Sequence, residues 1–297
     1  MWDNIVFILV IMIAIYIFKN KLYTIGKYLQ YYLKFGTVYF FIILNTLILM
    51  PLFIWNGKNV KNARLMADTS KDVTKLLGVT WHLKNAEIVS ENRGAVIILN
   101  HQSSLDLLGV CQFWYAWKKV AIVAKKEMFY FWPFGLGLYL MDAIFVDRGN
   151  PKVAHELLLT KSKNALQNKI KLLIFPEGTR NSDFTKFLPF KKGAFNIAVG
   201  AQVPIIPIVI SRYYFINHQR HIFNKGHVIA QCLEPISTEG LTMDDVPDLI
   251  NRVKSTMEET FKELSHEVTK DLPPDYPLAT KYVTKENSPN SRINLMI

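Results

Sequence analysis

The chain has 297 residues, half of them hydrophobic, and a formal net charge of +11. This length suits one α/β domain with short additions, and the hydrophobic share is high for a soluble domain but low for a multispanning transporter. The positive charge favours anionic partners. Since it is spread along the chain without a nucleic-acid-binding motif, it argues for a lipid surface or a phosphorylated substrate and against nucleic acid.

Two apolar runs begin the chain, at residues 5–18 and 35–55. The first is short for a bilayer core of ~30 Å, but no small-residue cleavage site follows it, so it is interpreted as a retained anchor. The second is uncharged and can span a bilayer, although Pro51 would kink or end it. Residues 1–57 are thus predicted to form membrane-anchoring helices. Basic residues flank the second run on both sides, so two spans and a shallow hairpin in one leaflet both stay open.

From about residue 88, short apolar strands alternate with helical segments. The predicted strands cover residues 96–99, 120–123, 171–175 and 203–210. Prolines in the last of them favour an edge position or a strand start. The alternation predicts an α/β domain over residues 58–270, with a mixed, largely parallel sheet flanked by helices.

Three other segments have distinct patterns. Residues 128–145 are almost wholly apolar and predict a buried helical hairpin, with a membrane-facing or acyl-chain-lining element as the alternative. Residues 245–264 show an amphipathic stripe, with Thr242 or Asp244 as a cap. Residues 271–297 are polar and rich in proline, which predicts a loosely ordered tail.

The segment that follows the first predicted strand contains His101 and Asp106. On one helix this spacing would place the two side chains about 140° apart, so they would not meet. They can meet if His101 lies in a loop and Asp106 in the first turn of a helix. Asp106 would then hold Nδ1–H and leave Nε2 to accept a proton from a substrate hydroxyl. A structural histidine at a strand end is the open alternative.

A second polar segment, residues 175–180, follows another predicted strand. Gly178 allows a tight turn, and Arg180 offers a planar fork that suits phosphate oxygens. Thr179 can donate a hydrogen bond, and Glu177 can bind a ligand hydroxyl or hold the arginine. Arg148 and Lys125 follow other apolar stretches and add positive charge, although each taken singly is better explained as a solvated surface charge.

Four blocks of this sequence together resemble the glycerolipid acyltransferases, specifically the 1-acylglycerol-3-phosphate acyltransferases. The blocks are NHQSSLD at 100–106, FVDRGN at 145–150, FPEGTR at 175–180 and VPIIPIVIS at 203–211. The resemblance extends over nearly the whole chain and favours the animal endoplasmic-reticulum type.

The resemblance implies a role for each candidate residue. His101 would deprotonate the sn-2 hydroxyl of lysophosphatidic acid as it attacks acyl-CoA, with Asp106 orienting the imidazole. The acceptor-binding loop would consist of Glu177, Gly178, Thr179 and Arg180, with Arg180 on the phosphate. Arg148 and Lys125 would be further contacts for the acceptor phosphate or CoA. Backbone amides near residues 102–104 are predicted to stabilise the oxyanion.

The implied product is phosphatidic acid, for phospholipid and triacylglycerol synthesis. The partners would be lysophosphatidic acid, acyl-CoA as co-substrate and a lipid bilayer, in the endoplasmic reticulum membrane with the catalytic domain facing the cytosol. No cofactor or metal is expected, since Cys111 and Cys232 lack metal-ligand spacing. The alternatives are another acceptor, such as glycerol-3-phosphate or a headgroup-bearing lysophospholipid, and a non-enzymatic scaffold for anionic lipid.

Overall fold

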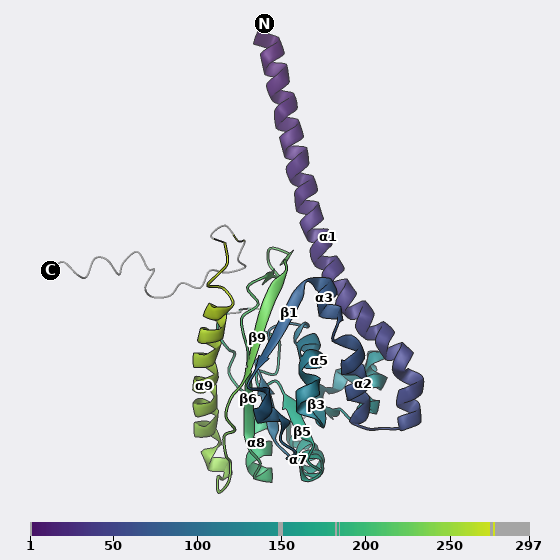
Figure 1. Ribbon diagram of the computed structural model, residues 1–297, viewed down its shortest axis with the longest axis vertical. Coiled ribbons are helices and arrows are strands. Elements are labelled where there is room, and N and C mark those ends of the chain that lie inside the picture. The colour runs from purple at the N-terminus through teal and green to yellow at the C-terminus, as the bar shows by residue number, and fades with distance from the viewer. Residues whose placement is uncertain (1, 148–150, 182, 184, 274–275, 277–297) are drawn as a thin grey trace, which may run out of the picture.

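A seven-stranded sheet in the order β1-β9-β6-β2-β5-β3-β4 forms the centre of the protein (Figure 1). The computed structural model describes residues 2–147, 151–181, 183, 185–273 and 276. Pairing is parallel throughout this sheet except between β6 and β9, which confirms the predicted mixed, largely parallel α/β fold. The strands are β1 (Val79–Lys84), β2 (Val96–Leu99), β3 (Val120–Lys125), β4 (Ile144–Val146), β5 (Lys171–Ile174), β6 (Ile205–Ile210) and β9 (Gly226–Cys232). A separate hairpin pairs β7 (Ile216–Asn217) with β8 (Ile222–Phe223).

The strand β6 lies in the interior of the sheet, between β9 and β2, so the edge position favoured by its prolines is wrong. Pro204 precedes the strand. The antiparallel pairing of β6 with β9 covers Ile208–Ile210. Pro207 lies one residue before this stretch, so the N–H that proline lacks breaks no hydrogen bond between these two strands. Every residue of β2 and β6 is buried, as expected for parallel strands covered on both faces.

Helices cover both faces of the sheet. In Figure 1, α9 lies on one side, and α2, α5 and the second half of α1 lie on the other. The amphipathic stripe predicted over residues 245–264 is confirmed as α9, and Thr242 forms a capping box with Asp245 before it. The helices are α1 (Trp2–Asn56), α2 (Lys61–Ser70), α3 (Val73–Leu77), α4 (Ala86–Ser90), α5 (Asp106–Trp117), α6 (Phe134–Leu140), α7 (Pro151–Gln167), α8 (Gly193–Ala201) and α9 (Val246–Glu267), with 3₁₀ helices η1 (Lys126–Tyr130) and η2 (Met243–Asp245).

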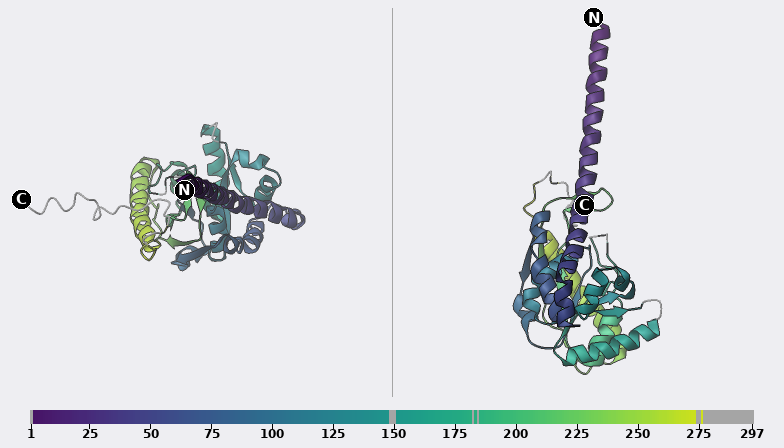
Figure 2. Two further views of the ribbon diagram at one scale, coloured as in Figure 1. Left: turned by 90° about the horizontal axis from the view of Figure 1, so that it is seen from above. Right: turned by 90° about the vertical axis from the view of Figure 1, so that its right-hand side faces the viewer.

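The N-terminal region is one continuous helix, α1, so the prediction of two helices is wrong. The polar segment between the two apolar runs contains no proline and a single glycine, Gly26, so nothing in it stops the helix, which also continues through Pro51. Its first half projects away from the domain, as Figures 1 and 2 show, and its second half packs on α2 and α6. The segment 11–56 is long and apolar enough to cross a membrane, which suggests membrane association.

The apolar segment at 128–145 is only half buried, so the predicted buried hairpin is wrong for its first part. Phe129, Tyr130, Phe131 and Trp132 are exposed, and Trp132 is 73% exposed. The second part forms α6, whose buried face packs on α1. The membrane-facing alternative stays a prediction for the aromatic residues of the first part. Of the predicted polar tail at 271–297, all but residues 271–273 and 276 lie outside the described residues.

A buried lysine opens β5 and gives stability a dependence on pH. Lys171 is 1% exposed, and its Nζ donates to the Glu91 carbonyl oxygen at 2.6 Å. Burial, with Lys118 and Arg93 nearby, lowers the pKa of Lys171 to about 8 from its usual 10.5. Below pH ~8 both the folded and the unfolded protein carry the charge, so the folded state bears the whole burial penalty. Between pH ~8 and ~10.5 the folded protein loses the proton first, so the free energy of unfolding rises.

Denaturant titrations of wild type and Lys171→Met in detergent, at pH ~7 and pH ~10.5, test this account. Over that range the wild type is expected to gain about 1–2 kcal/mol relative to the variant. An equal change in both proteins would mean that Lys171 is not the group responsible.

Candidate active site

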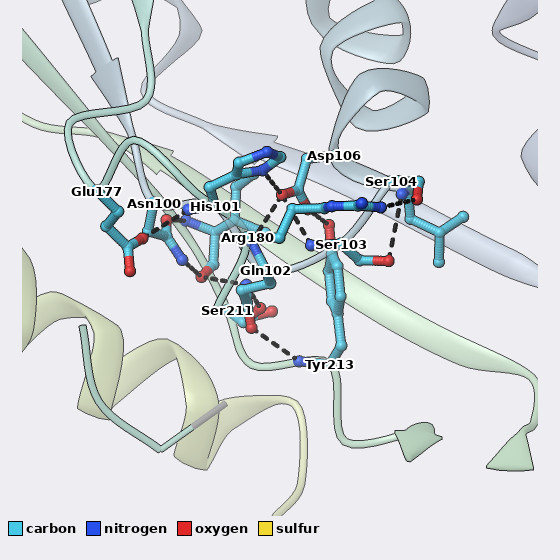
Figure 3. A network of polar contacts seen from close by, with 12 residues as sticks. Asn100, His101, Gln102, Ser103, Ser104, Asp106, Glu177, Arg180, Ser211 and Tyr213 are labelled. Carbon is cyan, nitrogen blue, oxygen red and sulfur yellow. Dashed lines mark hydrogen bonds and ion pairs between the residues drawn. The ribbon is translucent and has the colours of Figure 1, made fainter. Parts of the chain in front are cut away.

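The predicted pair at the end of β2 is joined by a hydrogen bond. His101 lies in the loop after β2, and Asp106 is the first residue of α5 (Figure 3). His101 Nδ1 and Asp106 Oδ2 are 2.6 Å apart. The loop is fixed at its start because Asn100 exchanges two hydrogen bonds with the backbone of Ile210 in β6. The strand-end loop and the helix start therefore provide the base–carboxylate geometry that the spacing required.

The Asp106 carboxylate is fully buried and accepts hydrogen bonds at both oxygens. Oδ2 also accepts the backbone N–H groups of Gln102 at 2.7 Å and Ser103 at 3.0 Å, while Oδ1 accepts the Tyr213 hydroxyl at 2.5 Å. Several donors and a helix start stabilise an ionised carboxylate in a buried site. Burial, followed by the nearby Asp106 charge, raises the pKa of Tyr213 well above its usual value, so its hydroxyl stays a donor.

Tyr213 is a site residue that motif reading missed. It comes shortly after β6, whose end lies beside the end of β2 because the two strands are parallel neighbours. The strand-end rule that pointed to His101 therefore applies to Tyr213 as well. The backbone amides of Gln102 and Ser103 donate to Asp106, so the prediction that they stabilise the oxyanion is wrong for these two, and it stays a prediction for the amide of Ser104.

The His101 ring is partly exposed and is held in place by the residue that follows strand β5. It stacks on Phe175, with ring centroids 4.1 Å apart and planes at 25°. The side chain keeps 19% of its surface exposed. The ring is thus fixed on one face, and at Nδ1, while part of it stays accessible to a ligand.

Glu177 fixes the backbone at His101 through hydrogen bonds to its carboxylate. Oε1 accepts the His101 N–H at 2.7 Å and Oε2 accepts the Leu188 N–H at 2.9 Å. The side chain is 2% exposed, and burial raises its pKa against the opposing effect of these two amides. The His101 carbonyl in turn accepts the Asn181 N–H at 2.8 Å. The geometry favours a positioning role for Glu177, since both of its oxygens already contact protein groups.

Arg180 and the two residues before it are at the surface of the site. Gly178 has φ +72°, a left-handed conformation that favours glycine, and Thr179 is exposed. Arg180 Nη1 donates to Ser104 Oγ at 2.8 Å, and the Tyr39 hydroxyl of α1 lies 2.6 Å from the same oxygen. An open cavity of about 260 Å³ lies beside the His101 loop, lined by Gln102, Ser103, Ser104, Arg180 and His218.

Of the two other predicted cations, only Lys125 lies within the described residues, and it is not among the residues that line this cavity. Lys125 ends β3, next to β5 in the sheet, but it is exposed and forms an ion pair with Glu127 at 3.0 Å. Arg148 lies outside the described residues. Within the described ranges, no three His, Cys, Asp or Glu side chains are grouped to hold a metal ion.

Comparison with known proteins identifies the family. A model of the acyltransferase family matches residues 81–211, a range that contains both polar loops. Human 1-acyl-sn-glycerol-3-phosphate acyltransferase alpha is 34% identical over 238 residues, which cover 80% of this chain and 83% of that protein. The human beta enzyme is 35% identical over 210 residues, covering 70% and 74%.

A solved structure shares the fold. The crystal structure of PlsC, the 1-acyl-sn-glycerophosphate acyltransferase from Thermotoga maritima, superposes with a TM-score of 0.61 at 23% identity, covering 82% of this chain and 97% of that one. With the two human relatives and the family model, the agreement extends over most of the chain. This protein therefore belongs to the 1-acyl-sn-glycerol-3-phosphate acyltransferase family.

Proposed function

We propose that this protein transfers a fatty acyl group from acyl-CoA to the sn-2 hydroxyl of 1-acyl-sn-glycerol 3-phosphate, giving phosphatidic acid. The observation that carries the proposal is the hydrogen-bonded pair of His101 and Asp106 beside a cavity lined by Arg180. This arrangement offers a base for an alcohol and a cation for a phosphate in one place. The names of the human relatives support the same acceptor.

The reaction needs one proton acceptor and no protein nucleophile. His101 Nε2 takes the proton of the lipid hydroxyl as its oxygen attacks the thioester carbonyl. Asp106 stabilises the imidazolium that forms. The tetrahedral intermediate then collapses, the carbon–sulfur bond breaks, and the departing CoA thiolate takes the proton from His101.

Residues of the 177–180 loop and two further cations complete the proposed machinery. Arg180 binds the acceptor phosphate, Thr179 donates a hydrogen bond to it, and Gly178 provides the tight turn. Glu177 holds the His101 backbone in place. Lys125 and Arg148 add positive charge for the acceptor phosphate or CoA. Acyl-CoA is a co-substrate, and no other cofactor is proposed.

The proposed location is the endoplasmic reticulum membrane, with α1 as an integral anchor and the catalytic domain toward the cytosol. A lysophospholipid and its product both reside in a bilayer, so an enzyme held at the lipid surface meets them there. The apolar helix α1 and the net positive charge support this location. Phosphatidic acid formed here would enter phospholipid and triacylglycerol synthesis.

Product analysis with purified protein and labelled acyl-CoA tests the proposal. Lysophosphatidic acid, glycerol-3-phosphate and lysophosphatidylcholine are offered as separate acceptors. Labelled phosphatidic acid should form at least ten times faster, by kcat/KM, than any other product. Preference for another acceptor would keep the enzyme class and overturn the substrate. Lipid binding without any transfer would favour a non-enzymatic scaffold.

Tyr213→Phe tests the positioning of the carboxylate. The change removes one hydroxyl bond to Asp106 and leaves the buried ring in place. A bond to a charged group is worth about 1.5–3 kcal/mol, so we expect kcat to fall about tenfold or more while KM for lysophosphatidic acid changes little. A merely structural tyrosine would lower the melting temperature and leave the kcat of the folded variant unchanged.

A further inference from the structure

The cavity at the active site has a lining residue that belongs to none of the four sequence blocks. His218 lies in the turn between β7 and β8, more than thirty residues after the Arg180 loop. The turn brings its ring to the same cavity that Arg180 and the Ser103–Ser104 segment line. Chain segments that are far apart in sequence thus meet around one space of about 260 Å³.

The His218 ring is held by the long helix α1. Its Nδ1 lies 2.6 Å from the Tyr31 hydroxyl, and Phe35 packs on the ring with centroids 5.7 Å apart. A second histidine of the same turn, His221, packs against Tyr28, Tyr31 and Tyr32 of α1 but does not line the cavity. The turn is therefore packed on α1, and of its two histidines His218 is the one that lines the cavity.

The electrostatics of the cavity favour an anion with more than one charge. Burial, then Arg180 and then His221, lowers the pKa of His218, so burial and the Arg180 charge both disfavour the protonated imidazole beside this cavity. None of the five lining residues is acidic. A bound anion would relieve this repulsion and stabilise the protonated imidazole. A terminal phosphate monoester carries a charge of about −1.5 to −2 at pH 7, whereas a phosphodiester carries a single charge.

We propose that His218 and Arg180 together bind the acceptor phosphate, and that His218 makes the site select a phosphate monoester over a phosphodiester. The inference rests on the proposed function and adds a specificity residue to it. The Arg180 guanidinium can donate two hydrogen bonds to one pair of phosphate oxygens. The imidazole of His218 can donate a further hydrogen bond to the third oxygen, which carries the second negative charge of a monoester. The hydrogen bond between Tyr31 and His218 makes this donor depend on the docking of α1.

The test compares lysophosphatidic acid with its phosphate methyl ester, which keeps the acyl chain, glycerol and hydroxyl and loses one charge. His218→Phe keeps a ring against Tyr31 and Phe35 and removes both nitrogens. His221→Phe is the matched control on the same turn. In His218→Phe we expect kcat/KM for lysophosphatidic acid to fall about 10- to 100-fold and that for the ester less than about threefold. His221→Phe should change both by less than about threefold.

The ratio of the two kcat/KM values is the deciding quantity. A ratio in His218→Phe equal to that of wild type would overturn the inference and leave the proposed function intact. Wild type that forms no phosphatidic acid would instead overturn the proposed function. If turnover of the ester is below detection, its inhibition constant against lysophosphatidic acid replaces kcat/KM. If His218→Phe does not fold, Tyr31→Phe replaces it, because this variant keeps the turn packed on α1 and removes the hydrogen bond that holds the His218 ring. An unchanged ratio in Tyr31→Phe would also overturn the inference.

Discussion

His101→Gln is expected to reduce kcat by about 10²–10⁴-fold, the range that a positioned general base contributes. The imidazole is the proposed proton acceptor, and Asp106 and Phe175 fix its orientation. A glutamine amide has no basic nitrogen, so it cannot take the hydroxyl proton. The binding of lysophosphatidic acid should change little, because Arg180 and the cavity stay in place. Steady-state kinetics and a direct binding titration in detergent provide the two readouts.

His82→Gln is a matched control for this variant. His82 is exposed on the edge strand β1, which β9 and β6 separate from β2, so its loss should leave kcat unchanged. Melting temperatures of both variants show whether the fold persists. Retention of more than a tenth of the wild-type kcat in His101→Gln would exclude the proposed role of the imidazole and favour a lipid-binding scaffold or a different base.

Asp106→Asn should lower kcat by a similar factor, about 10²–10⁴-fold, for a different reason. The buried carboxylate accepts from the His101 ring, two backbone amides and the Tyr213 hydroxyl. An asparagine has one acceptor oxygen and one NH₂ group. If the NH₂ faces Tyr213, the hydroxyl can turn to accept it, but the negative charge that stabilises the imidazolium is lost. If the NH₂ faces His101, Nδ1 must accept, the ring proton moves to Nε2, and Nε2 can no longer act as the base. The free energy of unfolding should also fall, by about 1–3 kcal/mol, for the unmet hydrogen bonds.

The exposed Asp72, in an ion pair with Lys75, offers the control for this second variant. Asp72→Asn should keep full activity, because exposed ion pairs contribute little to stability and neither residue of this pair lines the cavity. Asp106→Asn must be assayed at a temperature at which circular dichroism shows it folded. A folded Asp106→Asn variant with near-normal kcat would mean that the carboxylate does not orient the base.

The pairing of His101 with Asp106 was predictable because it depends on local rules. A buried strand, a short loop and a helix start place residues five positions apart within reach, and all three features are readable from the order of apolar and polar residues. The 177–180 loop was found by the same reasoning, since it follows a parallel strand that pairs with β2. Parallel strands bring such loops to one edge of the sheet.

The hydrogen-bond partners of these loops were not predictable, because they come from segments that are far away in the sequence. Glu177 was recognised, but the N–H groups that it accepts belong to the backbone, and backbone groups leave no mark in the residue pattern. Tyr213 follows β6, whose prolines suggested an edge rather than the interior position that brings it beside Asp106. The apolar pattern also predicts two runs where the structure has the single helix α1, and Tyr31, which holds His218, lies between these runs.

The central claim is that the acyl group passes directly from the thioester to a lipid hydroxyl activated by His101. The nearby serines are the rival nucleophiles, but Ser104 Oγ is engaged by Arg180 and Tyr39, and Ser103 Oγ accepts the Leu105 N–H. The most direct measurement is a rapid-quench experiment with acyl-labelled acyl-CoA, in which the enzyme is mixed with the donor alone and lysophosphatidic acid is added later. We predict that, after a denaturing quench, no label is covalently attached to the protein before the addition and that phosphatidic acid carries all transferred label afterwards. Label that accumulates on the protein first and then passes to the lipid would contradict the account.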